Sequence, residues 1–256
     1  MYISVIGPAL SGKTTLFQAL SGVESARGFS DGDNIISIDV PDERVDELSR
    51  IYRPKKTTYA RIELADTVAI SEGNVKDSTI NAKTLQKMRM SDAFILTLND
   101  FEEAAAAELE KEFHGIMSEF ILADMILIEG RLERIKKQAG KKENTALLLE
   151  EKLLEQCLAH VGEGKPLRTL ELAVSDEKTL RGFRFLSQKP MMIAINCSED
   201  GMGEMPGEEE RDMEGCPVIH VCASLECELA MMEEAERAAF MEEFSREIPL
   251  PVALQD

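Results

Sequence analysis

The chain has 256 residues, of which 44% are hydrophobic, so it is long enough to bury a core as one large domain or as one domain with an extension. Its 48 acidic and 29 basic side chains give a formal net charge of −19, which excludes nucleic-acid binding by bulk charge and leaves only local basic patches for that purpose. No apolar run approaches the roughly 18 residues that a membrane-spanning helix needs, so we expect no membrane partner.

The first predicted element is an apolar strand at residues 2–6, which ends at a glycine loop. Residues 7–14, GPALSGKT, match the pattern G-x-x-x-x-G-K-S/T. Glycines let the backbone form a nest of N–H groups around a phosphate, the lysine reaches the terminal phosphates, and the threonine hydroxyl can bind Mg²⁺. Leu16, Phe17 and Leu20 follow at helical spacing, as the motif requires. The expected phosphate-binding residues are Ala9, Leu10, Ser11, Gly12, Lys13, Thr14 and Thr15, with Thr14 also a metal ligand.

Five further apolar runs predict strands at residues 35–40, 60–66, 92–98, 190–196 and 217–222. Helical segments are interleaved with these runs, and this alternation predicts an α/β fold with a mostly parallel sheet. Ligands of such sheets collect at the carboxyl ends of the strands. Because Gly7, Asp66 and Asn196 all lie at such ends, we expect one cleft to use all three.

Between the runs at 92–98 and 190–196, the segment from about Glu102 to Gly162 has no proline and no predicted strand. Its apolar residues recur at alternating steps of four and three, and they resume at steps of seven after Gly140. This spacing predicts two antiparallel helices that form a coiled-coil hairpin, with a pair of ordinary packed helices as the alternative. The seam consists of Ile121, Met125, Ile128, Leu132, Ile135 and Ala139, and then of Leu147, Leu154 and Val161.

The turn of the predicted hairpin is basic, although the chain as a whole is acidic. Residues 131–143 carry six basic side chains against Glu133 and Glu143. One interpretation is a solvated helix flank with cations placed at a helix C-terminus. The other is a contact for RNA or an acidic protein. The six basic residues are Arg131, Arg134, Lys136, Lys137, Lys141 and Lys142.

The cysteines and histidines give no sign of a metal site. The five cysteines contain no C-x-x-C pair, and none of the three histidines stands beside a cysteine at metal-ligand spacing. Reduced thiols in a cytosolic protein are therefore expected. The start MYISVIG has neither the basic segment nor the long apolar segment of a signal peptide, which also favours a cytoplasmic location.

Several stretches of the sequence resemble the Obg-like ATPase family, which is the YchF-type branch of the translation-factor-related P-loop GTPases. The resemblance covers essentially the whole chain, in the order that the family has. The stretches are VPDERVDELSRIYRPKKTTYARIEL (40–64), ILADMILIEGRLERIKKQA (121–139), EGKPLRTLEL (163–172), NCSE (196–199) and CASLECELA (222–230).

This resemblance implies a P-loop G-domain that a helical hairpin interrupts. It places a nucleotide-binding domain at residues 1–115 and 175–256 and a coiled-coil insertion at 116–174. Members usually continue into a small β-rich TGS domain, which we expect to be lacking because the sequence stops after FMEEFSREIPLPVALQD. Family members associate with ribosomes, so the ribosome, RNA or an acidic protein are the expected partners of residues 131–142.

The resemblance also bears on which base is bound. Guanine-specific relatives carry N-K-x-D where this chain has Asn196 and Glu199, and Cys197 stands in place of the lysine that shelves the base. The longer Glu199 loses the paired hydrogen bonds that select guanine. ATP is therefore favoured, with GTP still open, and Ser224 is implied as a further nucleotide-binding residue.

Hydrolysis is where the sequence departs from the family. The motif D-x-A-G-L reads DTVAI at residues 66–70, so Asp66 can still bind Mg²⁺, but Ala69 replaces a glycine. Only Gly73 remains of the following glycine-rich switch, and Ser30 is a poor substitute for the threonine of the first switch. We assign no catalytic residue. Two hypotheses stand: a slow Mg²⁺-dependent NTP hydrolase that acts as a regulatory switch linked to translation, or a degenerate module that recruits a partner through the helical arm.

Overall fold

The computed structural model describes residues 1–21, 35–67, 70, 82–101, 106–138, 145–199 and 212–243. The chain divides into two compact units. The first consists of Met1–Ala69, Asp92–Ala105 and Met191–Asp256, and the second of Ile70–Ser91 and Ala106–Pro190. The second unit is thus wider than the insertion expected at 116–174. Val68, Ala69, Gly73 and Ser30, which entered the expectations about hydrolysis, lie outside the described residues.

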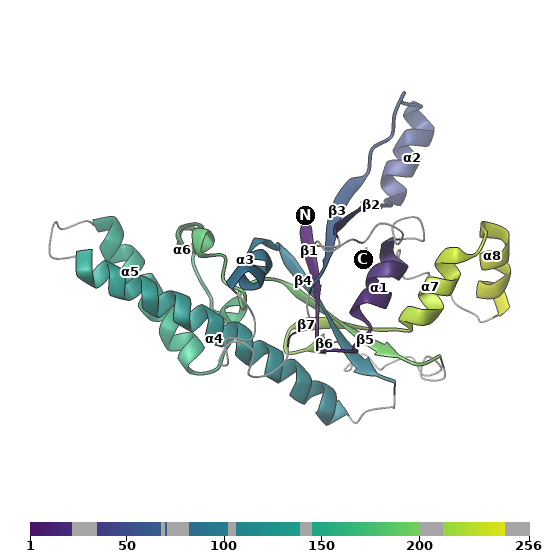
Figure 1. Ribbon diagram of the computed structural model, residues 1–256. Coiled ribbons are helices and arrows are strands. Elements are labelled where there is room, and N and C mark those ends of the chain that lie inside the picture. Colours follow the sequence, from purple (N-terminus) through teal and green to yellow (C-terminus); the bar gives the residue numbers. More distant parts are fainter. Residues whose placement is uncertain are drawn as a thin grey trace. The chain divides into compact units, whose positions relative to one another are not determined.

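A sheet with the strand order β2-β3-β1-β4-β5-β7-β6 forms the centre of the first unit (Figure 1). The inner pairs β3-β1, β1-β4, β4-β5 and β5-β7 are parallel, whereas β2 and β6 pair antiparallel at the two edges. This confirms the predicted α/β fold with a mostly parallel sheet. In the described part of the chain the strands are β1 (Tyr2–Ile6), β2 (Ile35–Val40), β3 (Ala60–Asp66), β4 (Ala93–Asp100), β5 (Met191–Cys197), β6 (Asp212–Met213) and β7 (Cys216–Val221).

The burial of each strand follows its place in the sheet. The first six residues of β4 are buried, because β4 has a strand on either side and apolar neighbours. β2, at the edge, alternates between exposed and half-buried positions. The six predicted strands are all present with ends within two residues of the expected ones, whereas the two-residue β6 was not predicted.

Helix α1 (Lys13–Ser21) packs its apolar face on this sheet. Leu16, Phe17 and Leu20 are buried in one cluster with Val5 of β1 and Ala223 of α7 (Ala223–Met231). α1 and α7 are direct neighbours, so the glycine loop and the turn after β7 lie close together. The other helices of this unit are α2 (Glu43–Tyr52) and α8 (Glu234–Glu243).

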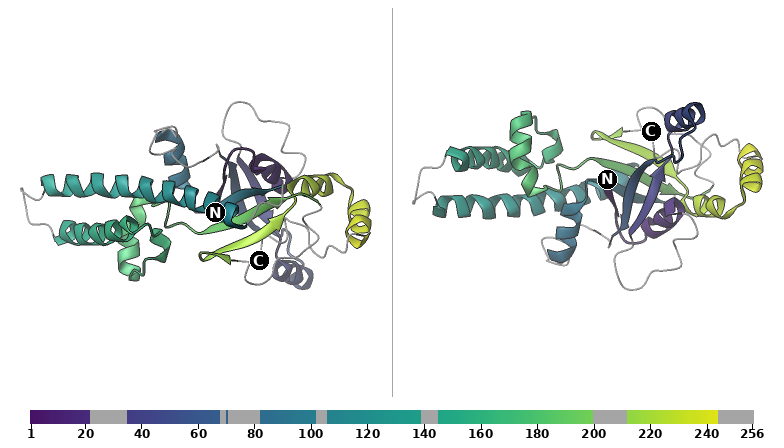
Figure 2. Two further views of the ribbon diagram at one scale, coloured as in Figure 1. Left: turned by 90° about the horizontal axis from the view of Figure 1, so that it is seen from below. Right: turned by 90° about the horizontal axis from the view of Figure 1, so that it is seen from above.

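The second unit is built on two long antiparallel helices that lie side by side, α4 (Ala106–Gln138) and α5 (Thr145–Gly162) (Figure 2). The predicted seam is buried between them. Ala139, the last residue of its first half, lies outside the described residues. The buried seam residues are Ile121, Ile128, Leu132, Ile135, Leu154 and Val161, with Met125 and Leu147 packed against them.

The hairpin has more cover than two helices alone provide. Leu167 and Leu180, from the segment that follows α5, are buried in the same apolar cluster, as is Phe185. Phe183 packs on this cluster and stacks on Phe185 with ring centroids 5.3 Å apart. The sequence pattern gave no sign of this third layer. It is carried by η2 (Leu167–Thr169), α6 (Val174–Leu180) and η3 (Arg181–Phe183), while α3 (Ala82–Met90) completes the unit.

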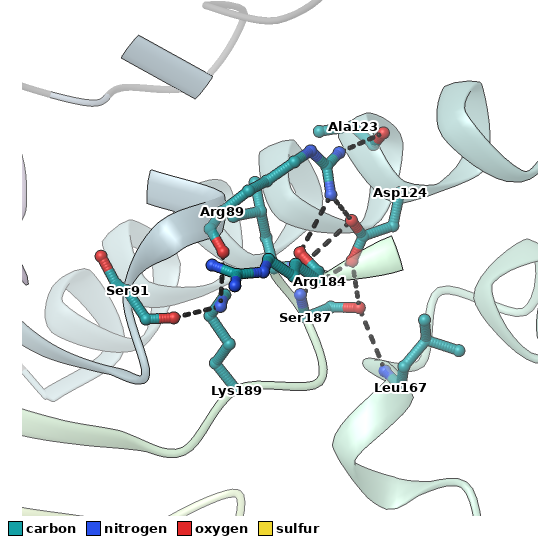
Figure 3. Close-up of polar contacts among 9 residues, drawn as sticks. Arg89, Ser91, Ala123, Asp124, Leu167, Arg184, Ser187 and Lys189 are labelled. Carbon is teal, nitrogen blue, oxygen red and sulfur yellow. Dashed lines mark hydrogen bonds and ion pairs between the residues drawn. The ribbon is translucent and has the colours of Figure 1, made fainter. Parts of the chain in front are cut away.

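A buried carboxylate ties these segments together (Figure 3). Asp124 of α4 is fully buried, and its Oδ1 accepts hydrogen bonds from the Arg89 guanidinium of α3 at 2.9 Å and from the Leu186 N–H at 3.0 Å. Its Oδ2 accepts from the Ser187 N–H at 2.8 Å and from the Ser187 hydroxyl at 2.9 Å. Each carboxylate oxygen thus has two donors, so burial of the charge is compensated.

We expect Asp124→Asn to destabilise the protein by about 3–5 kcal/mol, because it leaves the partly buried Arg89 without its counter-charge and turns an amide donor toward other donors. The shift of the urea midpoint measures this loss. The exposed Glu155→Gln on α5 removes the same charge and should stay within about 0.5 kcal/mol of wild type. Equal midpoints for the two variants would contradict the structural role of Asp124.

Candidate functional site

The loop between β1 and α1 depends on two glycines in conformations that other residues rarely adopt. Gly7 has φ +149°, and a Cβ there would lie 2.3 Å from the Thr97 carbonyl oxygen of β4. Gly12 has φ +84°, and its Cβ would lie 1.9 Å from Nδ2 of Asn196. Leu10 also has a positive φ of 65°, and its side chain is 89% exposed. Residues with positive φ turn successive N–H groups to one side, as in a phosphate-binding nest.

Lys13 and Thr14 open helix α1 directly after this loop. Lys13 is 7% exposed, and its ammonium donates a hydrogen bond to the Pro8 carbonyl. Burial lowers the pKa of Lys13 below its usual value, while the nearby Asp66 carboxylate acts in the opposite direction. The buried charge, the free N–H groups of the helix start and the helix dipole all favour an anion at this point.

Thr14 and Asp66 form an oxygen pair beside the loop. The Thr14 hydroxyl donates to Oδ2 of Asp66, the last residue of β3, at 3.0 Å. Oδ1 of Asp66 is buried and has no hydrogen-bond partner among the described residues, and the same holds for the Ser11 hydroxyl. Magnesium prefers carboxylate and hydroxyl oxygens and keeps several waters, so this pair with one unused oxygen fits Mg²⁺.

Asn196 of β5 connects the loop to the turn after β7. Its Nδ2 donates to the Ser11 carbonyl at 3.2 Å, and its Oδ1 accepts from the Ala223 N–H at 3.0 Å. The side chain is buried, and both ends of its amide are engaged. The three strand ends expected to share one cleft thus meet around the loop: Gly7 closes on β4, Asp66 contacts Thr14, and Asn196 contacts Ser11.

The positions expected to read the base differ in exposure. Cys197 is buried, and its thiol donates to the Val221 carbonyl at 3.3 Å, so it offers no shelf for a base. Glu199 is exposed in the turn after β5. Ser224 is exposed at the start of α7, and its hydroxyl lies 3.2 Å from Sγ of Cys222. No hydrogen bond links Glu199 or Ser224 to the described part of the loop.

Three contacts at the site were not predicted from the sequence. Thr97 of β4 lies under Gly7 and has a buried hydroxyl without a partner among the described residues. Thr67 donates to the Val5 carbonyl at 2.6 Å, and Cys227 of α7 donates to the Thr15 carbonyl at 3.2 Å. Thr97 had a usable signal, because it is the one polar residue inside the apolar stretch at 93–98. The other two depend on contacts between segments that are distant in sequence.

Three features together define a P-loop NTPase fold. A glycine loop follows the first strand of a mostly parallel sheet, and a lysine and a threonine open the next helix. An aspartate stands at the end of the neighbouring strand and contacts that threonine. No protein-family model matches the chain. The ribosome-binding ATPase YchF of Bacillus subtilis (strain 168) is 31% identical over 93% of this chain and 70% of its own length. The protein of the same name from Escherichia coli O157:H7 is 30% identical over 96% of this chain and 71% of its own length.

The fold agrees with these relatives. The structure of the YchF GTPase of Schizosaccharomyces pombe matches 99% of this chain and 74% of that chain, with a TM-score of 0.79 at 20% identity. The chain belongs to the YchF family. Within the residues that the structure describes, no helix combines the length and the apolar character needed to cross a membrane.

We expect Gly12→Ala to disrupt the site more than a substitution at Gly215, which has a similar φ of +77° but open space around its Cβ position. Both variants incur about 1–2 kcal/mol for a left-handed alanine, and Gly12→Ala adds about 1–3 kcal/mol from the overlap with Asn196. Urea unfolding measures the total loss, and hydrogen exchange of the Ala223 N–H reports the bond to Asn196. Equal stability and equal exchange in both variants would show that the positive φ of Gly12 alone requires glycine there, and that overlap with Asn196 has no effect.

Proposed function

We propose that this protein binds a purine nucleoside triphosphate with Mg²⁺ at the loop of residues 7–14 and acts as a nucleotide-controlled factor linked to translation. The observation that carries the proposal is the contact of Thr14 with Asp66, whose second carboxylate oxygen is buried and unpartnered. The relatives from B. subtilis and E. coli support it, because both are named ribosome-binding ATPases. A cytoplasmic location is part of the same proposal, because both relatives are named as ribosome-binding proteins.

Each part of the loop has a role in this proposal. The backbone N–H groups of residues 9–15 would surround the phosphates, and the Lys13 ammonium would exchange the Pro8 carbonyl for the terminal phosphate oxygens. Thr14 and Asp66 would hold Mg²⁺, which neutralises negative charge on the phosphates when it is bound. Slow hydrolysis is the reaction that such a site supports, and a single-turnover assay with ATP and GTP tests it.

The proposed base preference is ATP over GTP. Guanine selection needs a carboxylate that accepts two hydrogen bonds from the base edge, together with a long side chain that covers the ring. Glu199 is exposed and longer than the aspartate of guanine-specific proteins, while the buried Cys197 leaves the ring uncovered. Both features weaken the preference for guanine.

The helical arm is a proposed contact for ribosomal RNA or an acidic protein. Arg134 and Lys136 are exposed and have no ion-pair partner in the described part of α4 and α5. Arg131, in contrast, donates twice to Glu150, at 2.6 and 2.9 Å, and Lys137 lies 3.7 Å from Glu133. Lys141 and Lys142 lie outside the described residues. The arm therefore offers fewer available cations than its sequence suggests.

Lys13→Ala tests the nucleotide site. Removal of a charge-assisted contact should weaken ATP binding by about 1.5–3 kcal/mol, which is roughly tenfold to a hundredfold in affinity. Isothermal titration in the presence of Mg²⁺ measures this change. Lys111→Ala is the control, because Lys111 is exposed on α4 and has no partner among the described residues. If Lys13→Ala binds ATP as tightly as Lys111→Ala does, the proposed site is wrong.

Glu199→Asp tests the proposed base preference. The shorter carboxylate should raise the affinity for GTP relative to ATP by about tenfold, the value of one charge-assisted hydrogen bond. Competition titrations with both nucleotides give this ratio. Glu199→Gln keeps the length of the side chain and removes the charge, so it should give no gain for GTP. A wild type that already prefers GTP strongly would contradict our interpretation of Glu199 and Cys197.

A further inference from the structure

A cluster of unpaired cations lies outside both the nucleotide loop and the helical arm. Residues 48–62, LSRIYRPKKTTYARI, contain five basic side chains and no acidic one, in a chain with 48 acidic residues. The stretch runs from the end of α2 into β3, in the first unit. Within it, Arg50 is paired with Glu47 at 2.5 Å and Arg61 with Asp39 at 2.7 Å. The side chains of Arg53, Lys55 and Lys56 have no partner among the described residues.

The turn that carries these three cations is held in place from both sides. Arg53 ends α2 in a left-handed conformation with φ +46°, and its N–H donates to the Ser49 carbonyl at 2.9 Å. The hydroxyl of Ser49 lies 2.5 Å from the hydroxyl of Thr57, so the turn is closed beyond the lysines. Pro54 fixes its own φ between the two bonds. The cations are therefore displayed on a constrained segment, which lowers the entropy lost on binding.

An exposed aromatic ring lies next to the cations. Tyr52 directly precedes Arg53 and is 77% exposed, and every residue from Ile51 to Lys56 is exposed. Leu48 and Ile51 are also exposed, one turn and one residue earlier on α2. Surfaces that bind single-stranded nucleic acid combine a basic track for the phosphates with aromatic rings on which bases stack.

We propose that Arg53, Lys55 and Lys56 bind the phosphates of RNA, with a base stacked on Tyr52. We refer to these four residues as the α2–β3 surface. The proposal depends on the proposed association with ribosomes for one point, namely that the polyanion bound is RNA. Charge complementarity carries it: three unpaired cations within four residues stand out from a chain of net charge −19. An acidic protein partner would use the cations without needing the aromatic ring, and the test separates the two.

The test measures the binding of a fluorescent 20-nucleotide poly(U) RNA by anisotropy at several salt concentrations. Each phosphate contact contributes about 0.7–0.9 to the slope of the logarithm of the binding constant against the logarithm of the salt concentration. Three contacts therefore give a slope near −2 to −3, which is a loss of affinity of roughly 20- to 60-fold between 50 and 200 mM salt. The triple variant Arg53→Gln, Lys55→Gln and Lys56→Gln should lose most of this slope. Its ATP affinity should equal that of wild type.

A matched control removes the same charges elsewhere. Lys111, Lys178 and Arg181 are exposed and have no side-chain partner among the described residues, and together they are again two lysines and one arginine. Their triple glutamine variant has the same net charge, so it should keep the affinity and the slope of wild type if the α2–β3 surface is the site. Tyr52→Leu should weaken RNA binding about 5- to 100-fold, because it removes base stacking, and should leave the salt slope unchanged.

Each other outcome overturns the proposal or a stated part of it. No RNA binding by wild type, or equal loss in the two triple variants, rejects the α2–β3 surface. Polyglutamate that binds as tightly as RNA and is lost in the same triple variant identifies a surface for acidic proteins instead. An unchanged affinity of Tyr52→Leu rejects the stacking role. ATP titrations on the same preparations, with Lys13→Ala, decide separately whether the proposed nucleotide function holds.

Discussion

The side-chain amide of Asn196 is the contact on which the arrangement of the candidate site depends. It donates to the end of the glycine loop and accepts from the first residue of α7, so one buried group fixes two segments that are 212 residues apart, from Ser11 to Ala223. The strand order makes this possible, because β5 lies between β4 and β7 in the sheet. The same contact explains why Gly12 has no room for a side chain. The conformation of the glycine loop therefore depends on the same contact that joins β5 to the turn after β7.

The electrostatics of the loop are set before any ligand is bound. Lys13 is partly desolvated, which disfavours its charged form, and it is held by a carbonyl and by the field of Asp66. An anion at the helix start would add to the counter-charge that Asp66 provides for Lys13. Because the overall field of an acidic chain disfavours anions, a phosphate is favoured only where cations are locally preorganised, as they are at the start of α1.

Local patterns predicted most of the fold, and distant contacts account for what they missed. The glycine loop, the six longer strands and the seam of α4 and α5 each depend on residues within one short window, so spacing alone identified them. The Asp124 cluster joins Arg89, Asp124 and Ser187, which are separated by 35 and 63 residues, and a single sequence holds no signal for such a pairing. The site shows the same division. Lys13, Thr14 and Asp66 followed from motifs, whereas the bridging role of Asn196 required the structure.

The contacts of Lys189 in the Asp124 cluster have a consequence for the order in which the protein folds. The ammonium of Lys189 donates to the carbonyls of Arg89, at 3.0 Å, and of Ser91. β4 begins two residues after Ser91, β5 begins two residues after Lys189, and the pairing of these strands sets Phe94 beside Met191. If β4 and β5 pair while the residues between them are unfolded, the pairing closes a loop of nearly a hundred residues. If the helical unit has formed first, the pairing closes an effective loop of about five residues, and the entropic cost of closure is lower by roughly 2–3 kcal/mol. The contacts of Lys189 with Arg89 and Ser91 thus lower the entropic cost of pairing β4 with β5 through chain connectivity alone.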